Sequence, residues 1–231
     1  MAKIFSVGAS VLGGLFMLLI MSIPARAAIT NVYGGSIEYG DGAPSVQTGQ
    51  IIGNPLNVLD DGTKNDRQQG FNEAQGVLLT EDLLVDGGVI AKGMRVDSHM
   101  IFLNSRGLEK IYHYGVQWEF SGTILGVMSD IDGDLEAASS ELLGAEDTTY
   151  DNGNTNQSAP FRKRGMEADY DGYNILGLGN VLEVDMFVTE PGDWIRVVTV
   201  SAVPLPAALP LYGAGIAVLS FLGWRKRRGS A

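Results

Sequence analysis

The alternation of apolar and polar residues predicts a chain built mainly from β-strands between residues 29 and 201. The clearest signals are 181–188 (VLEVDMFV) and 194–200 (WIRVVTV), separated by the turn sequence Pro191-Gly192-Asp193. Runs rich in valine, isoleucine and aromatic residues, bounded by turn residues, are typical of strands. Further strands are expected at 30–39, 71–80, 83–85, 93–103, 111–120 and 123–128.

One segment departs from this pattern and predicts a short helix at 134–143 (DLEAASSELL). Its acidic residues come early, where they suit the positive end of the helix dipole, and Gly144 follows its last residue. The polar stretch 148–164 is expected to be a long loop. Several strands joined by glycine-rich turns, with one short helix, predict a mainly β fold of antiparallel β-sandwich or jelly-roll-like type.

The first 28 residues have the pattern of a signal peptide. Lys3 supplies a positive start, residues 11–23 are apolar apart from Ser22, and Pro24 ends the run. Ala25, Ala27 and Ala28 supply the small residues that signal peptidase reads, so cleavage is expected after Ala27 or Ala28. The apolar run is short for a membrane span of about 20 residues, which favours a signal peptide over an anchor helix.

Residues 202–231 predict a membrane-anchoring tail. Residues 207–224 form 18 positions without a charge, and a helix of this length reaches ~27 Å, enough to cross a hydrocarbon core. The basic run Arg225, Lys226, Arg227 and Arg228 follows and is expected to stay cytoplasmic, which places residues 29–201 outside.

A proline motif precedes this span: Val203, Pro204, Leu205, Pro206 and Ala207. Proline fixes φ and lacks an N–H, so the motif is expected to be extended and open to a processing enzyme.

The proline motif, the apolar span and the basic end together resemble the PEP-CTERM sorting signal in its VPLPA variant, with Leu205 in place of the glutamate of the family's name motif. The resemblance implies a substrate of exosortase, a membrane-embedded cysteine protease or transpeptidase of Gram-negative bacteria that cuts near the prolines. It also implies a transient inner-membrane anchor, followed by a periplasmic, cell-surface or extracellular location, often with exopolysaccharide and biofilm matrix. Residues 95–99, 124–127 and 192–199 resemble β-rich ectodomains that often precede such tails.

Charge and composition narrow the function of the central segment. Six of the 16 basic residues lie in the two end segments, which leaves ten basic and all 27 acidic residues in the centre, a net charge of −17. Such a surface argues against nucleic acid as a partner and disfavours binding flat on anionic lipid. The chain has no cysteine, which excludes cysteine catalysis and thiolate metal sites.

The densest acidic cluster predicts a calcium site as the one possible cofactor site: Asp130, Asp132, Asp134 and Glu136. Alternating carboxylates around a glycine can offer Ca²⁺ several oxygens at about 2.3–2.6 Å. The alternative is an acid-rich turn that caps the following helix. Segments 60–66 and 169–172 are weaker versions of the same pattern.

No catalytic residue set is predicted. The two histidines, His99 and His113, lie in strand-like runs without a metalloprotease motif, so ordinary half-buried strand residues are expected. Four aromatic residues could form a sugar-stacking platform or part of the core: Tyr112, Tyr114, Trp118 and Trp194.

Three hypotheses for function follow. The first is an exported, non-catalytic surface or biofilm-matrix protein associated with polysaccharide. The second is a polysaccharide hydrolase, which needs two facing carboxylates about 5–10 Å apart. The third is a calcium-stabilised, adhesin-like binding module.

Overall fold

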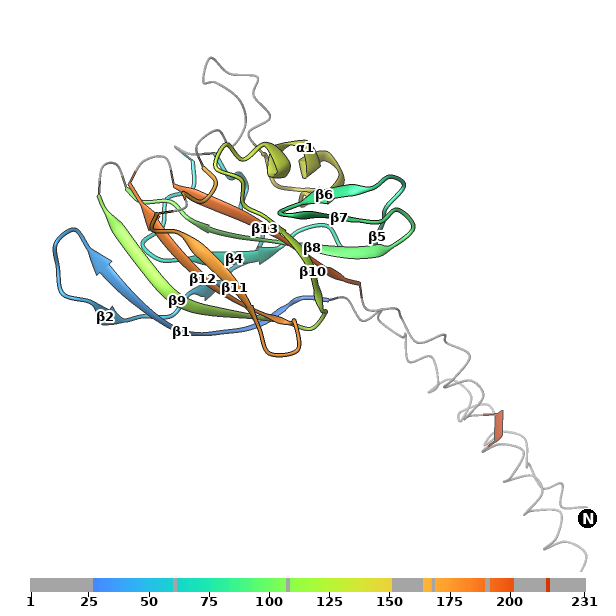
Figure 1. Cartoon of the computed structure of the whole chain (residues 1–231), viewed down its shortest axis with the longest axis horizontal. Helices are drawn as coiled ribbons and strands as arrows, with labels where there is room; N and C mark the ends of the chain where they lie inside the picture. The colour runs from blue at the N-terminus through green and yellow to red at the C-terminus, as the bar shows by residue number, and fades with distance from the viewer. Residues whose placement is uncertain are drawn as a thin grey trace, which may run out of the picture. The chain divides into compact units, whose positions relative to one another are not determined.

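The computed structural model of the chain describes residues 27–59, 62–106, 109–150, 164–167, 169–189, 192–201 and 215–216 (Figure 1). All but the last two lie in one compact unit, Arg26–Ala202. Most of the predicted signal peptide and the sorting tail lie outside the described residues, although residues 215 and 216, inside the predicted span, are helical. Within the described part of the chain, no helix has the length and apolar character that a membrane crossing requires.

The fold is mainly β, with two principal sheets. The outer sheet has the order β11 (Gly172–Leu176), β12 (Val181–Val188), β9 (Ile111–Phe120), β1 (Ile29–Tyr39) and β2 (Ser45–Val46). The inner sheet has the order β10 (Ile124–Met128), β13 (Asp193–Val200), β8 (Arg95–Leu103), β4 (Gln69–Asn72) and β3 (Gln50–Ile51), and β5 (Val77–Leu78) also pairs with β8. The hairpin β6 (Leu83–Val85) and β7 (Gly88–Ile90) and the helix α1 (Asp134–Leu143) complete the described elements. The pairings are antiparallel except β3 with β4.

The two sheets face each other across one hydrophobic core. Trp118 and Val184 of the outer sheet and Ile101, Ile195 and Val197 of the inner sheet belong to the same buried cluster, and all five are fully buried. Burial of this apolar surface is the main stabilising contribution to the fold.

The inner sheet is covered on its other face as well. Phe102 and Trp194 pack there against the segment that follows α1, and Val96 and Val198 pack against α1 and the β6–β7 hairpin, which Figure 1 shows on the side away from β9 and β12. The sequence pattern reflects this difference between the sheets. Seven of the eight residues of β13 are buried, whereas β12 alternates because one of its faces meets solvent.

A β-bulge interrupts the pairing of β9 with β12 between Val184 and Met186. Gly115 sits at the bulge with φ +65°, a conformation that glycine adopts without a steric penalty, and its N–H donates to Asp185 Oδ1 at 2.6 Å. The buried side chain of Gln68 donates to the carbonyls of His113 (2.8 Å) and Val184 (3.0 Å). The Gln68 amide thereby provides hydrogen-bond donors for two buried backbone carbonyls beside the bulge.

Most of the strand and helix predictions are confirmed. The helix has the predicted bounds, and β6, β9 and β12 coincide with the segments expected from alternation. The continuous strand predicted at 71–80 is wrong: β4 ends at Asn72 and β5 begins at Val77. Gly76 between them has φ +71° and donates its N–H to Asp97, which draws the chain out of the regular ladder.

Candidate functional site

The predicted calcium ligands Asp130, Asp132, Asp134 and Glu136 do not form a group of three or more neighbouring carboxylates among the described residues, although Asp130 lies near enough to Glu136 to help raise its pKa. The carboxylate of Asp130 accepts the N–H groups of Asp134 (2.8 Å) and Leu135 (3.0 Å), so it caps the start of α1. Glu136, in the first turn of α1, is fully buried, and burial raises the pKa of its carboxyl well above the usual range. The side chains of Asp132 and Asp134 are exposed.

Ala27 and Ala28, the described residues of the predicted signal cleavage site, are hydrogen-bonded to the domain. Ala27 is fully buried, and its N–H donates to the buried Asp97 Oδ2 at 2.7 Å. The N–H of Ala28 donates to Ser121 Oγ at 2.9 Å. Ala25 and the sorting residues 203–207 and 225–228 lie outside the described residues.

Both histidines are strand residues, as predicted, but they are fully buried and not half-buried as the sequence suggested. His99 lies between Asn72 Oδ1 (2.9 Å) and Thr199 Oγ1 (3.1 Å), and burial lowers its pKa to about 3. His113 accepts the N–H of Gln68 at Nδ1 (3.0 Å), which leaves Nε2 to donate to the Gln47 carbonyl at 3.0 Å. Neither is placed for proton transfer at a surface.

The four aromatic residues proposed as a sugar platform divide into two pairs. Trp118 and Trp194 are fully buried and belong to the core. Trp194 stacks on Phe102 with ring centroids 4.3 Å apart, and Trp118 Nε1 donates to Gln68 Oε1 at 3.0 Å. The two tyrosines, in contrast, lie on the outer face of the outer sheet.

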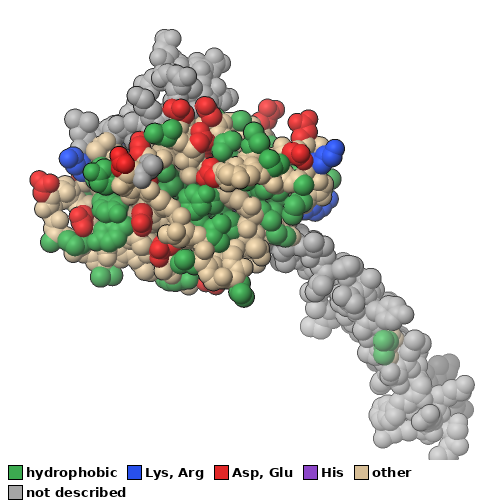
Figure 2. Space-filling model, in the orientation of Figure 1, with side chains coloured by type: hydrophobic (Ala, Val, Ile, Leu, Met, Phe, Trp, Pro, Cys, Tyr) green, Lys and Arg blue, Asp and Glu red, His purple; other side chains and the backbone are tan. Residues whose placement is uncertain are grey.

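These tyrosines are part of an aromatic patch formed by Tyr112, Tyr114, Tyr170 and Phe187. The rings of Tyr112 and Tyr114 are 4.7 Å apart, and Phe187 lies 5.9 Å from Tyr112 and 5.1 Å from Tyr170. Tyr170 is 63 % exposed, and the other three are half-buried. Figure 2 shows this face, where hydrophobic side chains gather over β9 and β12.

Carboxylates surround the aromatic patch. The hydroxyl of Tyr114 donates to Glu38 Oε1 at 3.4 Å. Burial raises the pKa of Tyr112, and the nearby Asp185, Asp171 and Glu38 add to this effect. Figure 2 shows acidic side chains interspersed with the hydrophobic ones on this face. The surface thus offers flat apolar rings next to strong hydrogen-bond acceptors.

Three carboxylates lie together beside the patch: Glu167, Asp171 and Asp193. One oxygen from each lies within 4.8 Å of the others. Burial raises the pKa of Asp171 to about 7, and Glu167 contributes to that rise. Burial also raises the pKa of Asp193 well above its usual range, with Asp171 and Glu167 adding and Arg164 opposing. The segment 169–172 indicated an acidic turn, but the partnership with Asp193 comes only from the fold.

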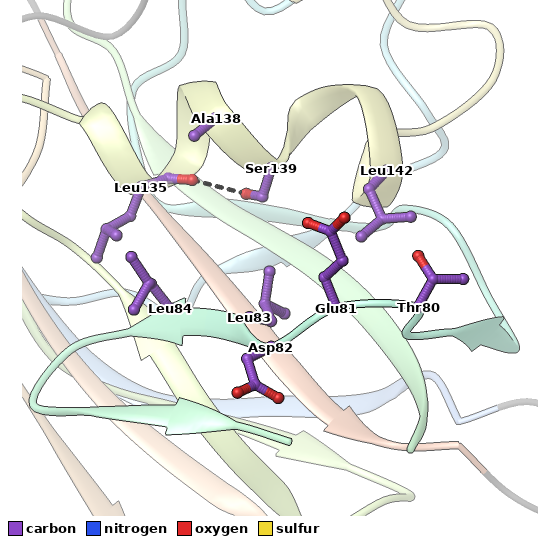
Figure 3. Close-up of a pocket in the computed structure, with 9 residues that line it drawn as sticks. All are labelled: Thr80, Glu81, Asp82, Leu83, Leu84, Leu135, Ala138, Ser139 and Leu142. Atoms are coloured by element: carbon purple, nitrogen blue, oxygen red, sulfur yellow. Dashed lines mark hydrogen bonds between the residues drawn. The ribbon is translucent and has the colours of Figure 1, made fainter. Parts of the chain in front are cut away.

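A groove of about 280 Å³ lies between α1 and the start of the β6–β7 hairpin (Figure 3). Its lining is mainly apolar and includes Leu83, Leu84, Leu135 and Leu142. Its two acidic residues, Glu81 and Asp82, are neighbours in sequence, and Figure 3 shows their carboxylates pointing in opposite directions. This arrangement does not resemble two carboxylates facing each other across a glycosidic bond.

Comparisons with protein-family models, with curated proteins and with solved structures found no match to this chain.

Proposed function

We propose that the chain is an exported, non-catalytic surface or biofilm-matrix protein that is sorted by exosortase and associates with extracellular polysaccharide. The routing part of the proposal is supported by the signal-peptide pattern at 1–28 and by the proline motif, apolar span and basic end at 202–231. The polysaccharide part is carried by one observation, the aromatic patch of Tyr112, Tyr114, Tyr170 and Phe187.

The two facing sheets with their shared core support a β-sandwich of jelly-roll-like type for the domain. Sheets packed in this way give a rigid platform whose outer strands can display side chains at fixed spacing. The patch lies on β9 and β12 and on the turn before β11. A ligand on this face would meet a surface held in place by regular backbone hydrogen bonds.

The chemistry of the patch suits a sugar chain. Pyranose rings have an apolar face of C–H groups that packs on aromatic rings, and hydroxyl groups around the edge that need hydrogen-bond acceptors. The four rings supply the first requirement, and Glu38 and Asp185 supply the second. A negatively charged surface favours neutral or cation-bridged polysaccharide over strongly acidic polymers.

A hydrolase is the less supported alternative. It requires an acid and a second carboxylate facing each other across a cleft, about 5–10 Å apart. The carboxylates in the groove beside α1 come from consecutive residues and point apart. The exposed rings of the aromatic patch are explained by ligand binding alone, without a catalytic step.

Mass spectrometry of the chain recovered from the cell surface tests the routing. The mature protein is expected to begin near Ala28 and to end near Val203–Pro206, without Arg225–Arg228. An intact basic end on the surface-exposed protein would contradict exosortase processing. The same experiment in a strain without exosortase serves as the control, and the uncut tail should accumulate there.

Binding to a panel of extracellular polysaccharides tests the role of the patch. Tyr112→Ala with Tyr114→Ala should reduce binding at least about tenfold, which corresponds to about 1.4 kcal/mol, because two aromatic faces that would pack on the sugar are removed together. Tyr33→Ala is the matched control, since Tyr33 is an exposed tyrosine of β1 outside the patch. Equal binding by both variants would remove the patch from the proposal.

A further inference from the structure

We propose that Glu167, Asp171 and Asp193 form a binding site for a divalent cation, with Ca²⁺ as the best match. This inference does not depend on the proposed polysaccharide role or on the sorting of the chain. It differs from the calcium site that the sequence predicted at residues 130–136, which involves other residues in another loop.

The spacing of the oxygens suits calcium. One carboxylate oxygen from each of the three residues lies within 4.8 Å of the other two. Two ligands on opposite sides of one Ca²⁺ are at most about 5 Å apart, because each Ca–O bond is about 2.3–2.6 Å long. The corresponding limit for Mg²⁺ is about 4.2 Å, and this smaller ion also demands near-ideal octahedral geometry, whereas calcium accepts flexible, irregular sets of oxygens. The donors are all oxygens, which suits a hard cation rather than zinc or copper.

Asp193 is the second and independent indication of a ligand. Its side chain is only 2 % exposed, and its Oδ2 has no hydrogen-bond partner. Buried carboxylates in proteins are normally paired, hydrogen-bonded or bound to a metal. The two neighbouring carboxylates of the cluster offer no donor while they are ionised, and a cation bound between them would be a partner for all three.

The loop that carries the other two carboxylates is held in place. Each oxygen of Asp171 accepts one N–H, from Phe187 (2.5 Å) and from Glu167 (2.8 Å), and each retains a lone pair for a cation. The N–H of Met166 donates to the Ser129 carbonyl at 3.2 Å. A Cβ on Gly165 would lie 1.7 Å from the Asp130 carbonyl oxygen, so the loop packs closely on the turn before α1.

The site is also open to solvent on one side. Glu167 is exposed, Asp171 is half-buried and Asp193 is buried. This gradient gives an ion a route of entry and leaves room for water to complete the six to eight oxygen ligands that calcium takes. Arg164 lies near enough to lower the pKa of Asp193, so it favours the ionised carboxylate while offsetting part of the negative charge.

Calorimetry and thermal unfolding of the full chain test the proposal. After treatment with EDTA, the chain is titrated with CaCl₂ alone. One ion is expected to bind with a Kd of about 0.1–1 mM, as in extracellular calcium modules. At 10 mM CaCl₂ the Tm should rise by about 3–10 °C. The absence of both a heat of binding and a shift in Tm would overturn the proposed site. A proton shared among the carboxylates would then explain the cluster.

Two variants assign the response to these residues. Asp193→Asn should weaken calcium binding at least tenfold and abolish the rise in Tm, yet its calcium-free Tm should not fall, because one buried negative charge is removed. Asp169→Asn, an exposed aspartate of the same loop outside the cluster, should respond like the wild-type chain. A calcium response that survives Asp193→Asn but disappears in Asp132→Asn with Asp134→Asn would overturn the proposal in favour of the loop before α1.

Discussion

The Arg196 guanidinium and the Glu73 carboxylate form a doubly hydrogen-bonded ion pair from which water is fully excluded. Arg196 Nε lies 2.7 Å from Glu73 Oε2, Nη2 lies 2.8 Å from Oε1, and neither side chain has exposed surface. Arg196 also donates to Ser139 of α1 at 2.7 Å, and Glu73 accepts the hydroxyls of Ser98 (2.7 Å) and Tyr150 (2.6 Å). The pair therefore joins the inner sheet to the helix and the segment that cover it.

Glu73→Gln should destabilise the domain by about 3–5 kcal/mol, because it leaves the buried Arg196 charge without a counterion. Urea unfolding followed by tryptophan fluorescence measures this change. Asp66→Asn is the matched control: it breaks the Arg67–Asp66 pair, whose side chains are 36 % and 57 % exposed, and should cost less than about 1 kcal/mol. Equal losses in the two variants would show that the buried pair has no special role.

Gln68→Met should cost at least about 2 kcal/mol although it preserves side-chain volume, because it leaves several buried polar groups without partners. These are the carbonyls of His113 and Val184 and the indole N–H of Trp118. Gln50→Met, at an exposed glutamine of β3, is expected to change the free energy of unfolding by less than about 0.5 kcal/mol. An unchanged free energy of unfolding in Gln68→Met would contradict this prediction and would mean that water replaces the lost hydrogen bonds.

Gly115→Ala should destabilise the domain by about 1–2 kcal/mol through backbone strain alone. The residue has φ +65°, and an added Cβ would meet no atom within 4 Å. Gly88→Ala is a suitable comparison, because Gly88 also has open space but lacks a positive φ. Chemical denaturation of both variants separates the conformational penalty from any steric one, and no difference between them would argue against strain at the bulge.

His99 should make the domain less stable in acid. Burial lowers its pKa from 6.5 in the unfolded chain to about 3 in the fold, so between these values the unfolded state binds a proton that the native state does not. The stability that comes from keeping His99 neutral is complete above pH 6.5. It falls as the pH drops, by up to about 1.4 kcal/mol per pH unit.

Unfolding free energies of the wild-type chain and of His99→Gln, measured from pH 4 to pH 7.5, test this prediction. The variant should show the flatter pH dependence even if it is less stable throughout, because the slope and not the absolute stability reports the proton. His113 is present in both chains and cancels in the comparison. Parallel curves would contradict a depressed pKa at His99.

The parts of the fold that local pattern determines were predictable from the sequence. Alternation located β9 and β12 because each has one face in the core and one toward solvent. The helix at 134–143 was predictable from its acidic start and its following glycine. The break near Gly76 was not, because it depends on a hydrogen bond to Asp97, which lies on another strand.

The candidate sites were predictable only in part, for the same reason. Tyr112 and Tyr114 stood out on an alternating strand, but their union with Phe187 and Tyr170 requires the pairing of β12 with β9 and of β11 with β12. The sequence around Asp193 predicts a turn before a strand. Nothing in that local sequence indicates that Glu167 and Asp171 lie close to Asp193 in the fold. Acidic spacing along the chain instead favoured Asp130–Glu136, where the fold uses Asp130 to cap a helix.

The two ends of the described domain meet on β8: Ala27 donates to Asp97 at 2.7 Å, and Ser201 donates to the carbonyl of Arg95 at 3.0 Å. Figure 1 shows the start of β1 and the end of β13 on the same side of the domain. The chain leaves through β13, which is bonded on both edges, to β8 and to β10. Backbone hydrogen bonds between antiparallel strands run across the strand direction. A pulling force applied at Ser201 along β13 therefore loads two ladders in shear together, an arrangement that resists mechanical unfolding.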